Sequence, residues 1–299
     1  MGKEGVRILF FGFGDVGGKC LKFMLENGYN VVGVFTHDRD SHESHWFEEP
    51  ELLAQKYGVP VFKPKKLDAL WAGKVGELKP ELLLSLYYRN RIPEEIFSQA
   101  KMGAYNLHGS YLPAYKGRAP LNWAIINGEN YTGVSLHVLE KDFDTGDIVA
   151  RKKVEFTDSD YVGDIIPRVS KAALEMFSET LPALVSGNVA KIPQSSLSEK
   201  SSYFGKRTPE MGRIDFSQPA RQIRNLVRAV SRPFNGAFFD ANGKRFTLWR
   251  ADIAQKESDA RAGEILEQSP ALLKIAATDG MLVSADFSVG DLPEATPDK

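Results

Sequence analysis

The chain has little of several features that mark common protein classes. Cys20 is its only cysteine, which excludes an internal disulfide and is typical of a reducing compartment. The longest apolar runs, residues 6–14 and 29–36, fall well short of the roughly 18 residues that a membrane-spanning helix needs. A net charge of −1 lacks the basic excess of many nucleic-acid-binding proteins. We therefore expect a cytoplasmic globular protein with no membrane partner, and the sequence argues against a nucleic-acid partner.

Signatures of covalent and metal-dependent catalysis are also missing from the sequence. There is no Gly-x-Ser-x-Gly motif, and Cys20 lies among apolar residues of a helical pattern, which favours a buried structural thiol. His42 and His45 are three residues apart in a polar segment, without cysteines or a carboxylate pair at a known ligand spacing. We therefore predict no metal site. The amino-terminal residues show neither a secretory nor a myristoylation signal.

Up to residue 108, short apolar segments alternate regularly with helical patterns. The predicted strands span residues 6–11, 29–36, 59–62, 81–88 and 104–108, and a helix is expected between each and the next. Such alternation predicts βαβ units, and hence a parallel sheet with helices on both faces. After residue 108 we expect a helix over 120–127, strands over 133–139 and 148–156, and a long helix that Pro167 interrupts in its first part.

The composition changes near residues 192–203, where serine and proline are frequent and no periodicity is visible. Beyond this segment, one amphipathic helix is followed only by short strands, including a hairpin signal at Asn242 and Gly243. The sequence therefore predicts an α/β domain over residues 1–190, a linker over 191–204 and a small β-barrel over 205–299.

Two patterns have both a functional and a structural interpretation. Gly12, Gly14 and Gly17 form Gly-x-Gly-x-x-Gly after a strand, and Asp38 or Asp40 lies about where a ribose-binding acid is expected. The motif fits a dinucleotide site, or a close approach of helix and strand without any nucleotide.

The second pattern is basic. Arg221, Arg224 and Arg228 share the face of a predicted helix opposite to its apolar one. They fit either a solvated surface or a site for the phosphate of a sugar nucleotide or RNA.

Asn106, His108 and Asp144 are the strongest candidate site. Residues two apart on a strand face the same side, so Asn106 and His108 are neighbours at a strand end that opens into a loop. An amide, an imidazole and a carboxylate together offer an oxyanion donor, an acid or base, and a group that orients and charges the imidazole. Since no nucleophile of the protein stands out, the chemistry is expected to be direct transfer to a nucleophile that the substrate supplies.

The motifs around this site resemble those of the folate-dependent formyltransferases. Residues 106–113 read Asn-Leu-His-Gly-Ser-Tyr-Leu-Pro, and 144–147 read Asp-Thr-Gly-Asp. The resemblance covers nearly the whole chain and implies a Rossmann-like domain followed by an OB-like barrel. Residues 117–123, Gly-Arg-Ala-Pro-Leu-Asn-Trp, are most similar to the formyltransferase that acts on UDP-4-amino-4-deoxy-L-arabinose, rather than to methionyl-tRNA formyltransferase.

The resemblance also implies roles for individual residues. Asn106 would stabilise the oxyanion, a protonated His108 would donate to it and handle proton transfer, and Asp144 would raise the pKa of His108. The formyl donor would be 10-formyltetrahydrofolate, and the acceptor the amine of a nucleotide-linked amino sugar. The residues expected to contact the folate are Asn90, Arg91, Ile92, Arg118, Glu140, Lys141, Asp142, Phe143 and Asp144. Under this interpretation the glycine motif is a feature of fold geometry. A homo-oligomer is left open, as are a dTDP-linked sugar and methionyl-tRNA as acceptors.

Overall fold

The structure, a computed structural model, describes residues 5–38, 48–255 and 259–292. The chain divides into two compact units. The first consists of Met1–Gly117, Thr132–Glu155 and Pro167–Phe204, and the second of Arg118–Tyr131, Phe156–Ile166 and Gly205–Lys299. The division into a domain over residues 1–190, a linker over 191–204 and a domain over 205–299 stays a prediction. None of the helices among the described residues is long and apolar enough to cross a membrane.

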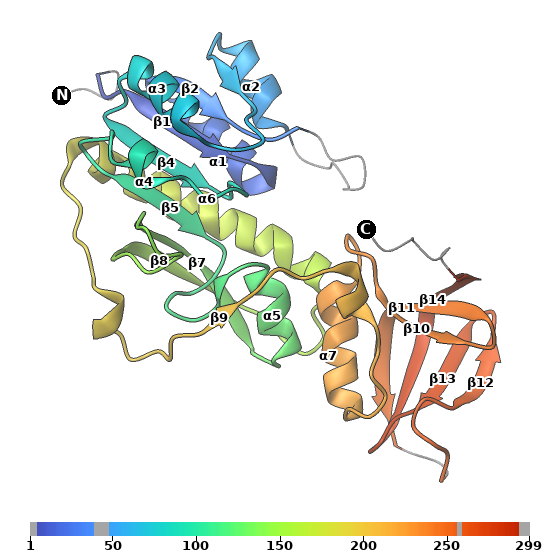
Figure 1. Ribbon diagram of the computed structural model, residues 1–299. Helices are drawn as coiled ribbons and strands as arrows, with labels where there is room; N and C mark the ends of the chain where they lie inside the picture. The colour runs from blue at the N-terminus through green and yellow to red at the C-terminus, as the bar shows by residue number, and fades with distance from the viewer. Residues whose placement is uncertain (1–4, 39–47, 256–258, 293–299) are drawn as a thin grey trace. The chain divides into compact units, whose positions relative to one another are not determined.

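The first unit is built on a seven-stranded sheet with the strand order β3-β2-β1-β4-β5-β7-β8 (Figure 1). Its strands are β1 (Ile8–Gly12), β2 (Val31–Phe35), β3 (Val61–Phe62), β4 (Leu82–Leu86), β5 (Ala104–His108), β7 (Tyr131–Val138) and β8 (Ile148–Glu155). Strands β1 to β5 pair in parallel, whereas β7 pairs antiparallel with β5. The predicted α/β class with a mainly parallel sheet is confirmed.

Helices connect these strands and supply the apolar side chains that bury the sheet. They are α1 (Gly14–Glu26), α2 (Pro50–Lys56), α3 (Ala69–Leu78) and α4 (Glu94–Phe97). Helix α5 (Pro120–Ile126) belongs to the second unit. Leu9 and Phe11 of β1 join Phe35 of β2 in a core that includes Val75 of α3 and Ile96 of α4. All five residues of β1 are buried, as expected for a central strand covered on both faces.

The long helix α6 (Val162–Ser186) runs without interruption through Pro167 and Pro182, so the predicted break at Pro167 is wrong. A proline inside a helix removes one backbone hydrogen bond. The apolar stripe of this helix, however, continues on both sides of Pro167, with Val162 and Ile165 before it and Val169 and Ala173 after it all buried. Burial of a continuous stripe outweighs the loss of one hydrogen bond.

The second unit contains a five-stranded antiparallel sheet with the order β10-β11-β14-β13-β12. Its strands are β10 (Ala237–Ala241), β11 (Lys244–Ala254), β12 (Ile265–Ser269), β13 (Leu272–Ala276) and β14 (Met281–Asp291). The hairpin predicted at Asn242 and Gly243 is confirmed, and both residues have the positive φ that such turns require. Helix α7 (Ala220–Val230) packs on this sheet.

The glycine motif lies where β1 leads into α1, and its last glycine, Gly17, packs closely against the backbone of neighbouring strands. A Cβ on Gly17 would lie 3.1 Å from the carbonyl oxygen of Leu86 in β4 and 3.2 Å from the carbonyl carbon of Gly12. The backbone of α1 approaches the strands so closely here that a side chain at position 17 would require its neighbours to shift by a few tenths of an ångström. This packing accounts for Gly17 without any nucleotide.

We expect Gly17→Ala to destabilise the protein by about 1–2 kcal/mol, because the methyl group overpacks this contact. Gly73→Ala is the matched control. Gly73 is also in a helix, but a Cβ there meets nothing within 4 Å. It should be neutral or stabilising by up to about 1 kcal/mol. Urea unfolding measures both changes, and equal effects of the two substitutions would contradict the packing role of Gly17.

Candidate active site

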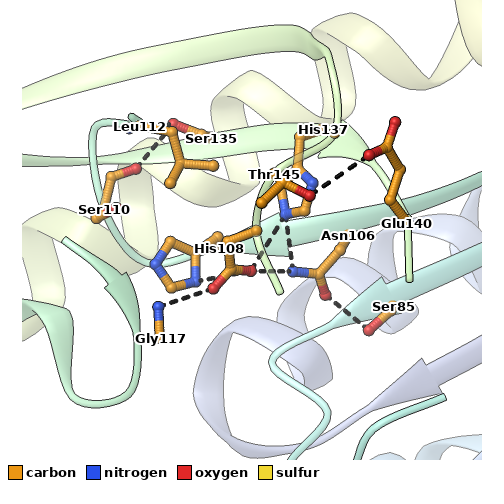
Figure 2. Close-up of polar contacts among 12 residues, drawn as sticks. Ser85, Asn106, His108, Ser110, Leu112, Gly117, Ser135, His137, Glu140 and Thr145 are labelled. Carbon is orange, nitrogen blue, oxygen red and sulfur yellow. Dashed lines mark hydrogen bonds and ion pairs between the residues drawn. The ribbon is translucent and has the colours of Figure 1, made fainter. Parts of the chain in front are cut away.

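The candidate site begins with a row of polar side chains across three neighbouring strands. Asn106 of β5 stands in register with Ser85 of β4 on one side and with His137 of β7 on the other. Residues opposite each other on adjacent strands project to the same face of a sheet, so these three side chains meet. The Ser85 hydroxyl donates to Asn106 Oδ1 over 2.7 Å, and Asn106 Nδ2 lies 3.1 Å from His137 Nε2 (Figure 2).

The direction of these hydrogen bonds fixes the orientation of the Asn106 amide. His137 Nδ1 lies 2.7 Å from the carbonyl oxygen of Val138, which can only accept, so Nδ1 carries the proton. In the neutral ring Nε2 is therefore an acceptor, and it receives a hydrogen bond from Asn106 Nδ2. Ser85 and His137 thus hold the amide from both ends. Neither residue was predicted as part of the site.

Asp144 brings a carboxylate to the same place from the turn that follows β7. Its Oδ2 accepts a hydrogen bond of 2.9 Å from the backbone N–H of Gly117. Its Oδ1 lies 3.4 Å from His137 Nε2, 3.5 Å from Asn106 Nδ2 and 3.6 Å from His108 Nδ1. The residue has a positive φ of 56°, a conformation that aspartate tolerates better than most residues. The three residues predicted from the sequence therefore meet in the structure, with the carboxylate between the other two.

The surroundings of Asp144 keep its carboxylate ionised although it is only 9% exposed. Burial alone would raise its pKa. The neighbouring His108 and His137 and the hydrogen bond from Gly117 outweigh burial and hold the pKa of Asp144 well below its usual range. The site therefore contains a fixed negative charge at neutral pH.

The pKa of His108 is shifted in the direction that favours the neutral imidazole. Burial lowers the pKa of this imidazole, and the nearby Asp144 and the Tyr115 carbonyl, which both favour the protonated form, do not fully compensate. Asp144 raises the pKa of His108, as predicted, but the net change in this pKa is a decrease. The expectation that His108 is protonated at rest is therefore wrong. Nε2 of His108 lies 2.9 Å from the Tyr115 carbonyl oxygen and must carry the proton, which leaves the lone pair on Nδ1 beside Asp144.

Two of the segments predicted to contact the folate, residues 90–92 and 141–143, lie together in the first unit. A cavity of about 580 Å³ is lined by Asn90, Arg91, Ile92 and Lys141, and also by Lys65, Lys66, Leu67, Pro93, Glu94, Glu95 and Phe97. The Arg91 guanidinium donates to the Lys141 carbonyl oxygen over 2.7 Å and lies over the ring of Phe143. Residues 90–92 and 141–143 are thereby joined.

The other predicted folate contacts have different positions. Glu140 and Asp142 accept hydrogen bonds from the Thr145 hydroxyl, through a side-chain carboxylate oxygen and a backbone oxygen respectively. Phe143 is 52% exposed. Arg118 belongs to the second unit.

The described residues offer less support for the alternative dinucleotide and metal sites than for the cluster around Asn106. His42, His45 and Asp40 lie outside the described residues, while Asp38 pairs with Lys63 at 3.0 Å. Among the residues that the structure describes, no group of three or more histidine, cysteine and acidic side chains could hold a metal ion.

The prediction that Arg228 lies on an exposed basic face of α7 is wrong. This guanidinium is fully buried and donates to the carbonyl oxygens of Thr157 and Asp160. Arg224 donates to the Ala251 carbonyl, and Arg221 pairs with Asp158. Two of the three cations thus serve the packing of the second unit, because a buried guanidinium must satisfy its donors within the protein.

The fold and the site together define a one-carbon transferase of the formyl transferase class. A sequence model described as "Formyl transferase" matches residues 6–181, and one described as "Formyl transferase, C-terminal domain" matches residues 206–287. The chain belongs to the formyl transferase family and is a formyltransferase. The family uses 10-formyltetrahydrofolate as its formyl donor.

Solved structures share this fold over nearly the whole chain. An N-formyltransferase from Helicobacter canadensis, in complex with folinic acid and dTDP-3-aminofucose, has a TM-score of 0.72 at 19% identity, covering 95% of this chain and 100% of that chain. WlaRD, a sugar 3N-formyltransferase solved with dTDP and 5-N-formyl-tetrahydrofolate, has a TM-score of 0.71 at 19% identity and covers 97% and 98%. HypX from Aquifex aeolicus, solved with tetrahydrofolic acid, has a TM-score of 0.63 at 21% identity over 94% of this chain and 44% of its own.

We expect the unfolding free energy to fall between about pH 7 and pH 5 partly because of His108. A lowered folded-state pKa means that the unfolded chain, with an ordinary histidine pKa of about 6.5, binds a proton that the folded protein does not. The stability is therefore present above pH 6.5 and is lost as the pH falls toward the folded pKa. The lowered pKa of Asp144 acts only below about pH 4.

Urea unfolding at both pH values measures this effect. His108→Gln should lose less stability than the wild type between pH 7 and pH 5. Equal losses in the two proteins would contradict a lowered pKa of His108.

Proposed function

We propose that this formyltransferase transfers the formyl group of 10-formyltetrahydrofolate to the amine of a nucleotide-linked amino sugar. The observation that carries the proposal is the cluster of Asn106, His108 and Asp144 at the carboxyl end of β5, in a chain of this family. UDP-4-amino-4-deoxy-L-arabinose is the first candidate acceptor, on the similarity of residues 117–123. A dTDP-linked amino sugar is the second, because two solved structures of similar fold contain dTDP or a dTDP-sugar.

We infer that the cavity lined by residues 65–67, 90–95, Phe97 and Lys141 holds the folate. Its volume of about 580 Å³ lies within the range of small-molecule sites. Leu67, Ile92 and Phe97 give it apolar walls for a ring system, and Asn90 and Arg91 add polar groups for the edges of the ring and for carboxylates. Bound there, the folate would supply the formyl group: the acceptor amine forms the new C–N bond, the bond between the formyl carbon and N10 breaks, and tetrahydrofolate leaves with the proton that His108 has taken from the amine.

Asn106 is suited to stabilise negative charge on the formyl oxygen. One hydrogen of its Nδ2 is used by His137 Nε2, whereas the next acceptor, Asp144 Oδ1, is at the limiting distance of 3.5 Å. The second hydrogen can therefore turn to a developing oxyanion. Because Ser85 and His137 fix the amide, little reorganisation is needed when the charge appears.

His108 is suited to accept the proton that the attacking amine releases. In its neutral form the lone pair lies on Nδ1, which takes the proton directly or through one water molecule. The proton then lies between Nδ1 and the carboxylate of Asp144, while Nε2 keeps its hydrogen bond to Tyr115. Asp144 thus stabilises the imidazolium only once it forms, which is a contribution specific to the reaction.

We expect Asn106→Ala to lower kcat by about 10²–10³-fold, because an oxyanion donor is lost from a preorganised site. Circular dichroism and thermal unfolding should show that the fold persists. Asn188→Ala, at an exposed position after α6, is the matched control and should retain wild-type activity. A near wild-type rate in purified Asn106→Ala would contradict the role assigned to Asn106.

The acceptor is tested by a formyl-transfer assay with 10-formyltetrahydrofolate and a panel of amines. The panel holds UDP-4-amino-4-deoxy-L-arabinose, dTDP-linked 3- and 4-amino sugars, and initiator tRNA charged with methionine. We expect turnover of a sugar nucleotide, detected as the N-formyl product by mass spectrometry, and none of the charged tRNA. Formylation of the tRNA alone would refute the proposed acceptor class.

A further inference from the structure

A segment that follows α6, residues 194–204, is attached to the candidate site at two points. The first is Gln194 in the short 3-10 helix Gln194–Ser196. Its buried amide nitrogen donates to the carbonyl oxygens of Asp144 and Gly146, over 2.8 and 2.9 Å. Gln194 thereby holds the backbone of the turn that carries the catalytic carboxylate in its left-handed conformation.

The second attachment is Ser202, which precedes strand β9 (Tyr203–Phe204). Its hydroxyl oxygen accepts a hydrogen bond of 2.9 Å from the backbone N–H of Tyr115, and its carbonyl oxygen accepts one of 2.9 Å from Lys116. Strand β9 then pairs in parallel with β6 (Lys116–Gly117), and the rings of Tyr115 and Phe204 stack.

The loop held in this way touches both ionisable members of the site. The carbonyl of Tyr115 accepts from His108 Nε2, and the N–H of Gly117 donates to Asp144 Oδ2. Tyr115 has a φ of 59°, a strained conformation for a residue with a side chain, which persists only when its surroundings enforce it. Gly117 has a φ of 93°, and a Cβ there would lie 2.2 Å from the carbonyl oxygen of Phe204, so only glycine fits.

We propose that Ser202 and Gln194 are positioning residues, through which the segment 194–204 sets the tautomer of His108 and the place of the Asp144 carboxylate. The inference rests on the catalytic roles proposed for His108 and Asp144. Ser202 holds the Tyr115 backbone through its hydroxyl and the next peptide through its carbonyl oxygen, and the Tyr115 carbonyl selects the Nε2–H tautomer, which leaves the Nδ1 lone pair for the proton. Gln194 and Gly117 fix Asp144 opposite that lone pair, from its backbone and from its carboxylate.

The alternative is that Ser202 only ties the segment to the domain. A purely structural tie would change stability, but it would leave the ionisation and tautomer of His108 as they are in the wild type. The groups that face His108 are Asp144, His137 and the Tyr115 carbonyl. Ser202→Ala keeps all three in the chain and removes only the hydroxyl that holds Tyr115.

The experiment is ¹⁵N NMR of the histidine imidazoles as a function of pH in the full-length protein, with the His108 signals assigned by their loss in His108→Gln. In the wild type we expect neutral His108 to carry its proton on Nε2. In Ser202→Ala we expect a mixture of tautomers and a lower pKa, because the loop that carries the Tyr115 carbonyl loses one of its two hydrogen bonds to residue 202 and holds this carbonyl less firmly against His108. Ser201→Ala, at the exposed neighbouring position, and Ser202→Thr, which keeps the hydroxyl, should both match the wild type.

Kinetics provide the second readout. Loss of one positioning hydrogen bond should lower kcat by about ten-fold in Ser202→Ala, with KM for the acceptor unchanged, because Ser202 holds the loop rather than the substrate. Wild-type His108 tautomer and pKa in folded Ser202→Ala would overturn the inference. The NMR readout needs no acceptor, so a failure of the proposed function in the acceptor assay is distinguishable from a failure of this inference.

Discussion

The buried carboxylate of Asp144 is the group on which the rest of the site depends. A charge with so little exposure is costly unless the protein surrounds it with donors and positive charge. Here the N–H of Gly117 donates to the carboxylate, and the imidazoles of His108 and His137 lie within 3.6 Å of it, where each stabilises the negative charge when it is protonated. In the proposed mechanism Asp144 in turn stabilises the proton that His108, buried and neutral at rest, takes up during the reaction.

The sheet and two separate loops bring these groups together. Ser85, Asn106 and His137 are adjacent because β4, β5 and β7 pair in register, so their arrangement follows from hydrogen bonds of the backbone. Asp144 lies in a turn and Gly117 in the two-residue strand β6, both outside the seven-stranded sheet, so this sheet determines their positions less strongly. The segment 194–204 restrains both residues. Gln194 donates a hydrogen bond to the Asp144 carbonyl oxygen, and strand β9 pairs with the strand that contains Gly117.

The sequence predicted the parts of this arrangement that depend on local periodicity and on motif. Asn106 and His108 were found because strand residues two apart share a face, and Asp144 because its turn belongs to a recognised motif. Ser85 and His137 could not be found in this way, since the register between strands is not encoded in any one strand. Arg228 was assigned to the surface because a charged residue is usually exposed, whereas the loop 157–160 offers carbonyl groups that bury it.

The ionisation of the buried Asp144 carboxylate is the property on which the proposed mechanism depends most, because this charge stabilises the proton that His108 takes up. It is tested most directly by following the ¹³Cγ chemical shift of Asp144 with pH, assigned by comparison with Asp144→Asn. We expect no titration of Asp144 down to the lowest pH at which the protein remains folded. Titration at or above the ordinary aspartate pKa of about 3.9 would contradict it.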